Sequence, residues 1–344
     1  MCFDIRVHSW KRALHVEFPQ ESKQHTQPSH CTFAEFVRTE PKGRNSPAVI
    51  ASCAWDEVTW GEPVPRREQI REAILAKKYT PITKDIRGQL ILLGTGTSVG
   101  VPTIGCGCPV CTSDDPHNKR TRCGVVLGLP EGNLLIDTPP DLRFQLLREG
   151  IGIIHAVLFT HEHADHIFGL DDLRLMPFFL GYPVPLYCEE IVEGRIRKSF
   201  EYAFSDIEQT HKGAVPRLSF ERITTEPFEV LGTRVTPIRL RHGPRFEVLG
   251  FRIGNVAYCT DTNEIPPASW PLLEGLDVLI LDALRTTPHV THFSLDEAIE
   301  VARKLKPRRT LFTHISHDLD YEETNAKLPP GMELAYDGQR VLLT

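Results

Sequence analysis

The stretch that decides the fold reads Thr160-His161-Glu162-His163-Ala164-Asp165-His166. It follows an apolar run at residues 153–159 that predicts a buried strand, so its polar side chains would leave a strand end, where active sites are often built. Two imidazoles at alternate positions suit one cation. The carboxylate and imidazole that follow suit a second cation, because both donor types bind zinc, manganese and iron. A solvated polar loop is the alternative interpretation, but four potential ligands in six residues favour a metal site.

The composition is that of a globular protein. Of 344 residues 41% are apolar, which is enough to build one large or two ordinary domains. No apolar run approaches the roughly 20 residues that span a bilayer, and no signal-peptide stretch opens the chain, so we expect a cytoplasmic protein without membrane contact. Residues 89–344 carry 25 Lys and Arg against 34 Asp and Glu. This acidic balance disfavours long nucleic acid as a partner.

The N-terminal quarter differs from the rest of the chain. Residues 1–87 show no sustained helical or strand period, and we expect a largely disordered extension with one charged helix at residues 66–78. Its three cysteines lack metal-ligand spacing and are expected to be ordinary thiols: Cys2, Cys31 and Cys53. We expect the main domain to span residues 88–344, and upstream over-translation is one explanation for the extension.

Three other cysteines form a close cluster, Cys106, Cys108 and Cys111, in a loop rich in Gly and Pro. Their spacing is too tight for a disulfide framework in a chain of this length, and the loop is too polar for three buried thiols. Three thiolates can surround one tetrahedral ion that still needs a fourth ligand. The loop therefore predicts a structural zinc site in a reducing compartment.

Two nearby segments have more than one interpretation. The glycine-rich residues 94–100 follow a predicted strand, but without a Walker lysine or a following helix they favour a tight turn near the metal site over a phosphate-binding loop. Lys119, Arg120 and Arg122 form a basic cluster that we interpret as a solvated face. Asp141 is expected to cap a helix at residues 142–149.

Three more ligand candidates each follow a strand-like apolar run, namely His242, Asp261 and His314. Each is unremarkable alone, but convergence of these strand ends with the central motif would complete a two-metal site with Asp261 as the bridging carboxylate. The full set would then be His161, His163, Asp165, His166, His242, Asp261 and His314.

A further apolar run at residues 278–282 predicts a buried strand, and residues 295–305 predict a helix that Ser294 can cap. His292 lies just before this helix. Its position fits a surface imidazole and a catalytic imidazole equally well.

The motif at residues 161–166 resembles the His-x-His-x-Asp-His signature of the metallo-β-lactamase superfamily, and the match is complete. The resemblance implies an α/β fold, a four-layer αββα sandwich of two mixed sheets with helices outside, over residues 88–344. It also implies a metal-dependent hydrolase with two divalent ions, Zn or Mn. Asp137 falls where the superfamily places an acid behind the ligands.

Within the superfamily, the chain is most similar to the phosphodiesterases that open phosphoribosyl 1,2-cyclic phosphate in phosphonate breakdown. The shared features are the cysteine loop, the histidine motif and the segment Leu-x-Thr-His-Ile-Ser-His at residues 311–317. This resemblance implies that His317 is the fourth ligand of the structural zinc and that His292 is the general acid. Residues 283–285 and 1–87 depart from that family, which puts the substrate in doubt.

The expected enzyme uses a metal-bridging hydroxide as nucleophile, with Asp165 at the catalytic centre and His292 protonating the leaving alkoxide. A small, cyclic phosphodiester is the expected substrate, and a homodimer is compatible with these features. Two alternatives stay open within the same fold. One is a ribonuclease Z-like tRNA 3′-processing endonuclease, although residues 168–236 lack an RNA-gripping insertion, and the other is a pyrroloquinoline-quinone biosynthesis protein.

Overall fold

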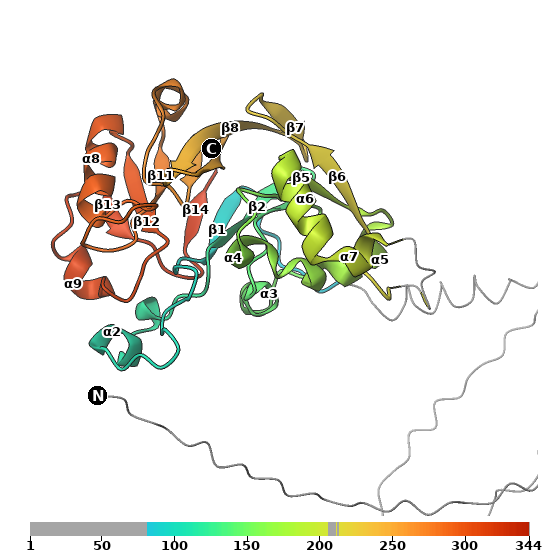
Figure 1. The fold of residues 1–344 in the computed structure, drawn as a ribbon, viewed down its shortest axis with the longest axis horizontal. Helices are drawn as coiled ribbons and strands as arrows, with labels where there is room; N and C mark the ends of the chain where they lie inside the picture. Colours follow the sequence, from blue (N-terminus) through green and yellow to red (C-terminus); the bar gives the residue numbers. More distant parts are fainter. Residues whose placement is uncertain (1–80, 206–210, 212, 344) are drawn as a thin grey trace, which may run out of the picture. The chain divides into compact units, whose positions relative to one another are not determined.

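The computed structural model describes residues 81–205, 211 and 213–343. Most of the expected extension, with its helix at residues 66–78 and its three cysteines, lies outside the described residues. The described part of the chain is built on two sheets of seven strands each (Figure 1).

The first sheet is antiparallel from β14 to β3 and parallel from β3 to β6. Its strands lie in the order β14 (Arg340–Leu342), β1 (Gln89–Gly94), β2 (Gly124–Leu129), β3 (Gly132–Ile136), β4 (Ala156–Leu158), β5 (Val184–Cys188) and β6 (Leu218–Arg222).

The second sheet is parallel from β13 to β10 and antiparallel from β10 to β7. Its strands lie in the order β13 (Met332–Leu334), β12 (Arg309–Thr313), β11 (Val278–Asp282), β10 (Val256–Cys259), β9 (Phe246–Ile253), β8 (Thr233–His242) and β7 (Phe228–Val230). Both sheets are therefore mixed, as expected.

The helices are short and lie outside the sheets (Figure 1). Those on the first sheet are α3 (Leu142–Glu149), α4 (Ala164–Ile167), η2 (Leu170–Leu175), α5 (Met176–Leu180), α6 (Glu190–Ser199) and α7 (Glu201–Phe204). The remainder are α2 (Pro109–Thr112), η1 (Pro116–Asn118), η3 (Pro267–Leu273), α8 (Leu295–Leu305) and α9 (Tyr321–Asn325). None of the helices in the described residues is both long and apolar enough to cross a bilayer.

The alternation of side chains along β1 shows how the layers form. Leu90 and Leu92 pack in the core between the two sheets, whereas Ile91 and Leu93 pack in the core beneath the helices. Successive side chains of a strand point to opposite faces, so a strand covered on both faces is apolar throughout. A third core joins the second sheet to α8 and η3. The result is the four-layer αββα sandwich that the resemblance implied.

Two predictions near the first sheet are wrong in detail. Asp141 precedes α3, but its side chain makes no capping hydrogen bond; it accepts instead from the backbone and side chain of Arg122. Arg120 is buried and donates to Thr95 and to the carbonyl of Ala335, so the basic cluster is not simply a solvated face. In both cases the partner lies elsewhere in the chain: Arg122 is 19 residues from Asp141, and Ala335 is 215 residues from Arg120.

The predicted helix at residues 295–305 is confirmed as α8. Ser294 caps α8 and forms a capping box with Glu297. Elsewhere, Phe200 separates α6 from α7.

Candidate metal centre

Four strands of the two sheets deliver the candidate ligands to one place. The central motif follows β4, His242 ends β8, Asp261 lies two residues beyond β10, and His314 directly follows β12. The sequence-predicted side chains therefore come together at neighbouring strand ends.

The ligand atoms fall into two adjacent groups. In each group the ligand atoms all lie within 4.8 Å of one another. The first group consists of His161, His163 and His242, and the second of Asp165, His166, Asp261 and His314. Asp261 also lies within the same distance of His242, which belongs to the first group. This carboxylate therefore stands between the two groups.

Asp137 orients the central motif from behind. Its carboxylate accepts hydrogen bonds from the backbone and hydroxyl of Thr160, both at 2.8 Å, and from His166 Nδ1 at 2.8 Å. Because Nδ1 of His166 is used in this way, Nε2 faces the second group, 3.2 Å from a carboxylate oxygen of Asp261. Asp137 is thus a positioning residue and not a ligand, as the resemblance implied.

A backbone carbonyl orients His242. Its Nδ1–H donates to the carbonyl oxygen of Thr291 at 2.8 Å, which leaves Nε2 for the first group. Burial lowers the pKa of His242, His161 and His314, so these rings tend to be neutral, the form that binds metal ions.

The backbone is strained at the centre. Asp137, Asp261 and His314 all have left-handed φ angles, at 64°, 54° and 60°. Non-glycine residues in this region cost on the order of 1–3 kcal/mol each and cluster at functional sites. The fold holds these three residues at strand ends despite that cost.

The donor set suits divalent metal ions. Nε2 of His161, His166 and His314 is buried and makes no hydrogen bond within the described part of the chain. A buried polar atom without a partner costs about 1–3 kcal/mol, and coordination of a cation would remove that cost. Imidazoles mixed with carboxylates are ligands for zinc and manganese, so the residues present fit such ions.

His292 lies beside the two groups and is held by an acid that the sequence did not reveal as its partner. Its Nδ1–H donates to Asp282 at 2.7 Å, and its ring stacks on that of His314 with centres 4.4 Å apart. Burial lowers the pKa of His292, but the Asp282 carboxylate outweighs it and raises the pKa to about 9. A protonated imidazole next to the ligands is equipped to donate a proton.

Asp282 ends β11, directly after the apolar run at residues 278–281. Because β11 is parallel to β12, its end lies at the same sheet edge as His314. A carboxylate directly after a buried strand is the sequence signal that could have identified it.

The cysteine cluster forms a second, separate group. His317 Nδ1 lies 3.3 Å from Cys106 Sγ, 3.8 Å from Cys108 Sγ and 3.4 Å from Cys111 Sγ. In a tetrahedral zinc site with ordinary bond lengths, sulfur and nitrogen ligands stand about 3.5 Å apart. Burial raises the pKa of the Cys111 thiol, and the hydrogen bond from Thr103 N to Cys111 Sγ at 3.3 Å opposes this rise. Four donors with these separations fit a structural zinc.

The glycine-rich turn at residues 94–100 is hydrogen-bonded to Ile315, which lies between His314 and His317. Ile315 N donates to Thr95 O at 2.9 Å, and Thr97 N donates to Ile315 O at 3.2 Å. A Cβ on Gly94 would stand 1.9 Å from Arg122 O, so only glycine permits this packing. The segment is a close-packed turn beside the candidate metal centre.

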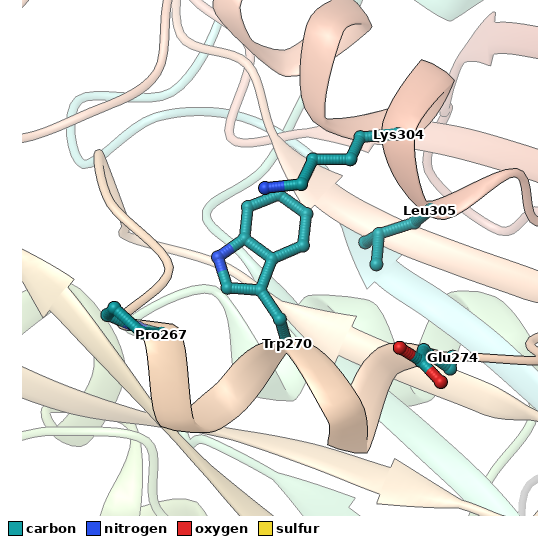
Figure 2. Close-up of a pocket in the computed structure, with 5 residues that line it drawn as sticks. All are labelled: Pro267, Trp270, Glu274, Lys304 and Leu305. Carbon is teal, nitrogen blue, oxygen red and sulfur yellow. The ribbon is translucent and has the colours of Figure 1, made fainter.

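A pocket of about 510 Å³ lies elsewhere, between η3 and the end of α8 (Figure 2). Lys304 Nζ lies 3.6 Å from the centre of the Trp270 ring at this pocket. None of its lining residues belongs to either ligand group: Pro267, Trp270, Glu274, Lys304 and Leu305. The metal centre is therefore the better candidate for the active site.

Comparison with known proteins identifies the family. Residues 132–315 match the beta-lactamase superfamily domain. The chain belongs to the metallo-β-lactamase superfamily. Together with the donor set, this match makes the chain a metal-dependent hydrolase.

One solved superfamily structure is similar over nearly all of its length. A crystal structure described as a new diphosphatase from the PhnP family is 46% identical, with a TM-score of 0.70, over 74% of this chain and 98% of that chain. This superfamily member is therefore related to the PhnP family.

Curated relatives are matched over smaller parts. An octanoyltransferase of Porphyromonas gingivalis is 36% identical over 257 residues, which are 74% of this chain and 51% of that protein. A coenzyme PQQ synthesis protein B of Methylorubrum populi is 33% identical over 122 residues, 31% of this chain and 40% of that protein. The chain spans about half or less of the length of these curated relatives.

Proposed function

We propose that this hydrolase is a dinuclear phosphodiesterase that acts on a small, cyclic phosphodiester such as phosphoribosyl 1,2-cyclic phosphate. The observation that carries the proposal is the arrangement of two adjacent donor groups on either side of Asp261, with His292 beside them. These two adjacent sets of metal ligands could hold two cations. Two cations together could bind the anionic oxygens of a phosphodiester.

The candidate ligands divide between the two ions. His161, His163 and His242 would hold one, while Asp165, His166 and His314 would hold the other, with Asp261 bridging. Two divalent cations, zinc or manganese, would activate water and neutralise charge on the phosphodiester. We also propose that Cys106, Cys108, Cys111 and His317 hold a structural zinc.

His292 is the proposed general acid. Its Nδ1–H is bound to Asp282, so the transferable proton is on Nε2. A sugar alkoxide is a poor leaving group and needs a proton as the ester bond breaks. Asp282 stabilises the imidazolium and holds the ring in place, as a second acid does for a catalytic histidine.

Charge and relatedness support a small substrate. Residues 89–344 have nine more acidic than basic side chains, counting Lys and Arg against Asp and Glu, which opposes binding of a polyanion. The 46% identity to a PhnP-family structure supports a small phosphate compound over tRNA. A second candidate is a diphosphate, because that relative is described as a diphosphatase.

The test is turnover of four substrates by the metal-loaded protein. We expect efficient opening of a small cyclic phosphate, slower hydrolysis of bis(p-nitrophenyl) phosphate, and little cleavage of pyrophosphate or precursor tRNA. Preferred cleavage of pyrophosphate would establish the second candidate. Efficient tRNA cleavage would overturn the proposal of a small substrate.

A further inference from the structure

The loop between β11 and α8 carries a second imidazole, His289, three residues before His292. Its Nδ1 accepts hydrogen bonds from the hydroxyl of Thr291 at 3.1 Å and from the backbone N–H of Thr291 at 3.4 Å. A backbone N–H can only donate, so Nδ1 is unprotonated and the neutral ring carries its proton on Nε2. The carbonyl of Thr291 meanwhile orients His242. Thr291 thus positions the candidate ligand His242 and also selects the tautomer of His289.

His289 is a ring neighbour of His292 and belongs to neither ligand group. The ring centres of His289 and His292 are 5.3 Å apart, and those of His292 and His314 are 4.4 Å apart. Among the described residues, no ring contact joins His289 to His314. Nε2 of His289 also makes no hydrogen bond to a described residue, and the side chain is partly exposed. The Nε2–H of His289 is therefore available to donate a hydrogen bond next to the proposed general acid, His292.

The loop that presents this donor is held in place at several points. Arg285 donates to the carbonyls of Thr287 at 3.2 Å and Pro288 at 3.0 Å. On the other side the loop packs against Gly243, where a Cβ would stand 2.6 Å from the Thr291 side chain. Gly243 also has a φ of 72°, so no other residue suits this contact. The donor is positioned before substrate arrives.

We propose that the Nε2–H of His289 binds an oxygen substituent of the leaving alcohol, such as a hydroxyl or ring oxygen of a sugar. This inference rests on the proposed function. Ions held by the metal ligands would bind the phosphoryl oxygens, and His292 would meet the leaving oxygen. A donor beside His292 can meet atoms attached to that oxygen. His289 would therefore select sugar-type alcohols over simple ones.

The charge state of His289 suits this role. Burial lowers the pKa of His289, and the neighbouring His292 and Arg285 lower it further. The ring is thus a neutral hydrogen-bond donor at pH 7, and does not compete with His292 for transfer of a proton.

The test compares two five-membered cyclic diesters that both release an alkoxide, ribose 1,2-cyclic phosphate and ethylene phosphate. Only the first carries additional oxygens on its leaving alcohol. In His289→Ala we expect KM for the ribose compound to rise roughly five- to tenfold, the loss of about one hydrogen bond, with kcat and the ethylene phosphate kinetics changed less than twofold. His289→Asn keeps an N–H donor and should recover part of the loss.

A binding experiment separates this inference from the proposed function. The affinities of metal-loaded protein for ribose 1-phosphate and 2-hydroxyethyl phosphate can be measured by calorimetry without turnover. The inference requires His289→Ala to weaken only the ribose compound, with metal content unchanged. Equal weakening of both compounds, or none, would overturn it, whereas failure of the wild-type protein to open either diester would overturn the proposed function alone.

Discussion

At the scale of single residues, two imidazoles at the metal centre use their two nitrogens for separate tasks. In His166 and His242, Nδ1 donates to a fixed protein oxygen, and Nε2 faces the candidate ion. The oxygen comes from Asp137 for the first ring and from Thr291 for the second. Such partners set ring orientation and basicity, so their effect is measurable on metal affinity.

Asp137→Asn is expected to weaken metal binding by about ten- to a hundredfold, because the amide cannot accept all the hydrogen bonds of the carboxylate. Asparagine tolerates the left-handed backbone at this position, so the fold should be kept. Dialysis against a metal buffer measures the affinity. Asp141→Asn, which alters only a pair with Arg122, is the matched control and should bind metal normally.

His292→Ala should slow hydrolysis of diesters with alkoxide leaving groups by roughly a hundredfold or more, since no proton reaches the leaving oxygen. A nitrophenolate leaves without a proton and should be affected much less. Steady-state kinetics on both kinds of diester measure the difference. Equal losses on both would remove His292 from the acid role.

At the scale of elements, the short helix α2 begins within the cysteine loop. Cys108 is its N-cap and accepts from the backbone N–H of Cys111 at 3.4 Å, a contact that lowers the pKa of the Cys108 thiol. A four-residue helix has little stability of its own, so the proposed zinc would supply most of it.

Cys108→Ser should therefore release about one zinc per chain and lower the melting temperature. Elemental analysis and thermal unfolding measure these effects. Asp165→Ala should instead abolish turnover while the structural zinc is retained. Cys188→Ala, at a buried cysteine of β5 outside the ligand groups, is the control and should lose no metal. Unchanged zinc content in Cys108→Ser would exclude the structural site.

At the scale of the whole molecule, the order of the strands brings together site residues that are far apart in the sequence. The strands and the motif at residues 161–166 could be predicted because each is a local pattern. The pairing of His292 with Asp282, and of Arg122 with Asp141, could not be predicted, since each joins separate segments of the chain, 10 and 19 positions apart. The burial of Arg120 escaped prediction for the same reason, because its partners are Thr95 and Ala335.

The proposed domain boundary at Gly88 can be tested by shortening the chain. Ile86 is buried in the core beneath the helices, and Lys84 N donates to Gly150 O at 2.9 Å. We expect deletion of residues 1–80 to preserve metal content and activity. Deletion of residues 1–87 should cost about 2 kcal/mol from loss of the buried Ile86 side chain, as denaturant unfolding would measure. Lost activity in the shorter deletion would show that the extension contributes to the site.

His314 belongs to the proposed two-metal site and His317 to the proposed structural zinc site. Both lie within one segment of four residues. Its attachment to the turn at Thr95 and Thr97 leaves little freedom to adjust one histidine without the other. Linkage is reciprocal, so an ion that orders His317 should tighten binding at His314, and the reverse by the same factor. If manganese occupied the site at His314, a cell short of zinc would still lose activity of this enzyme, because the empty zinc site at His317 would weaken manganese binding.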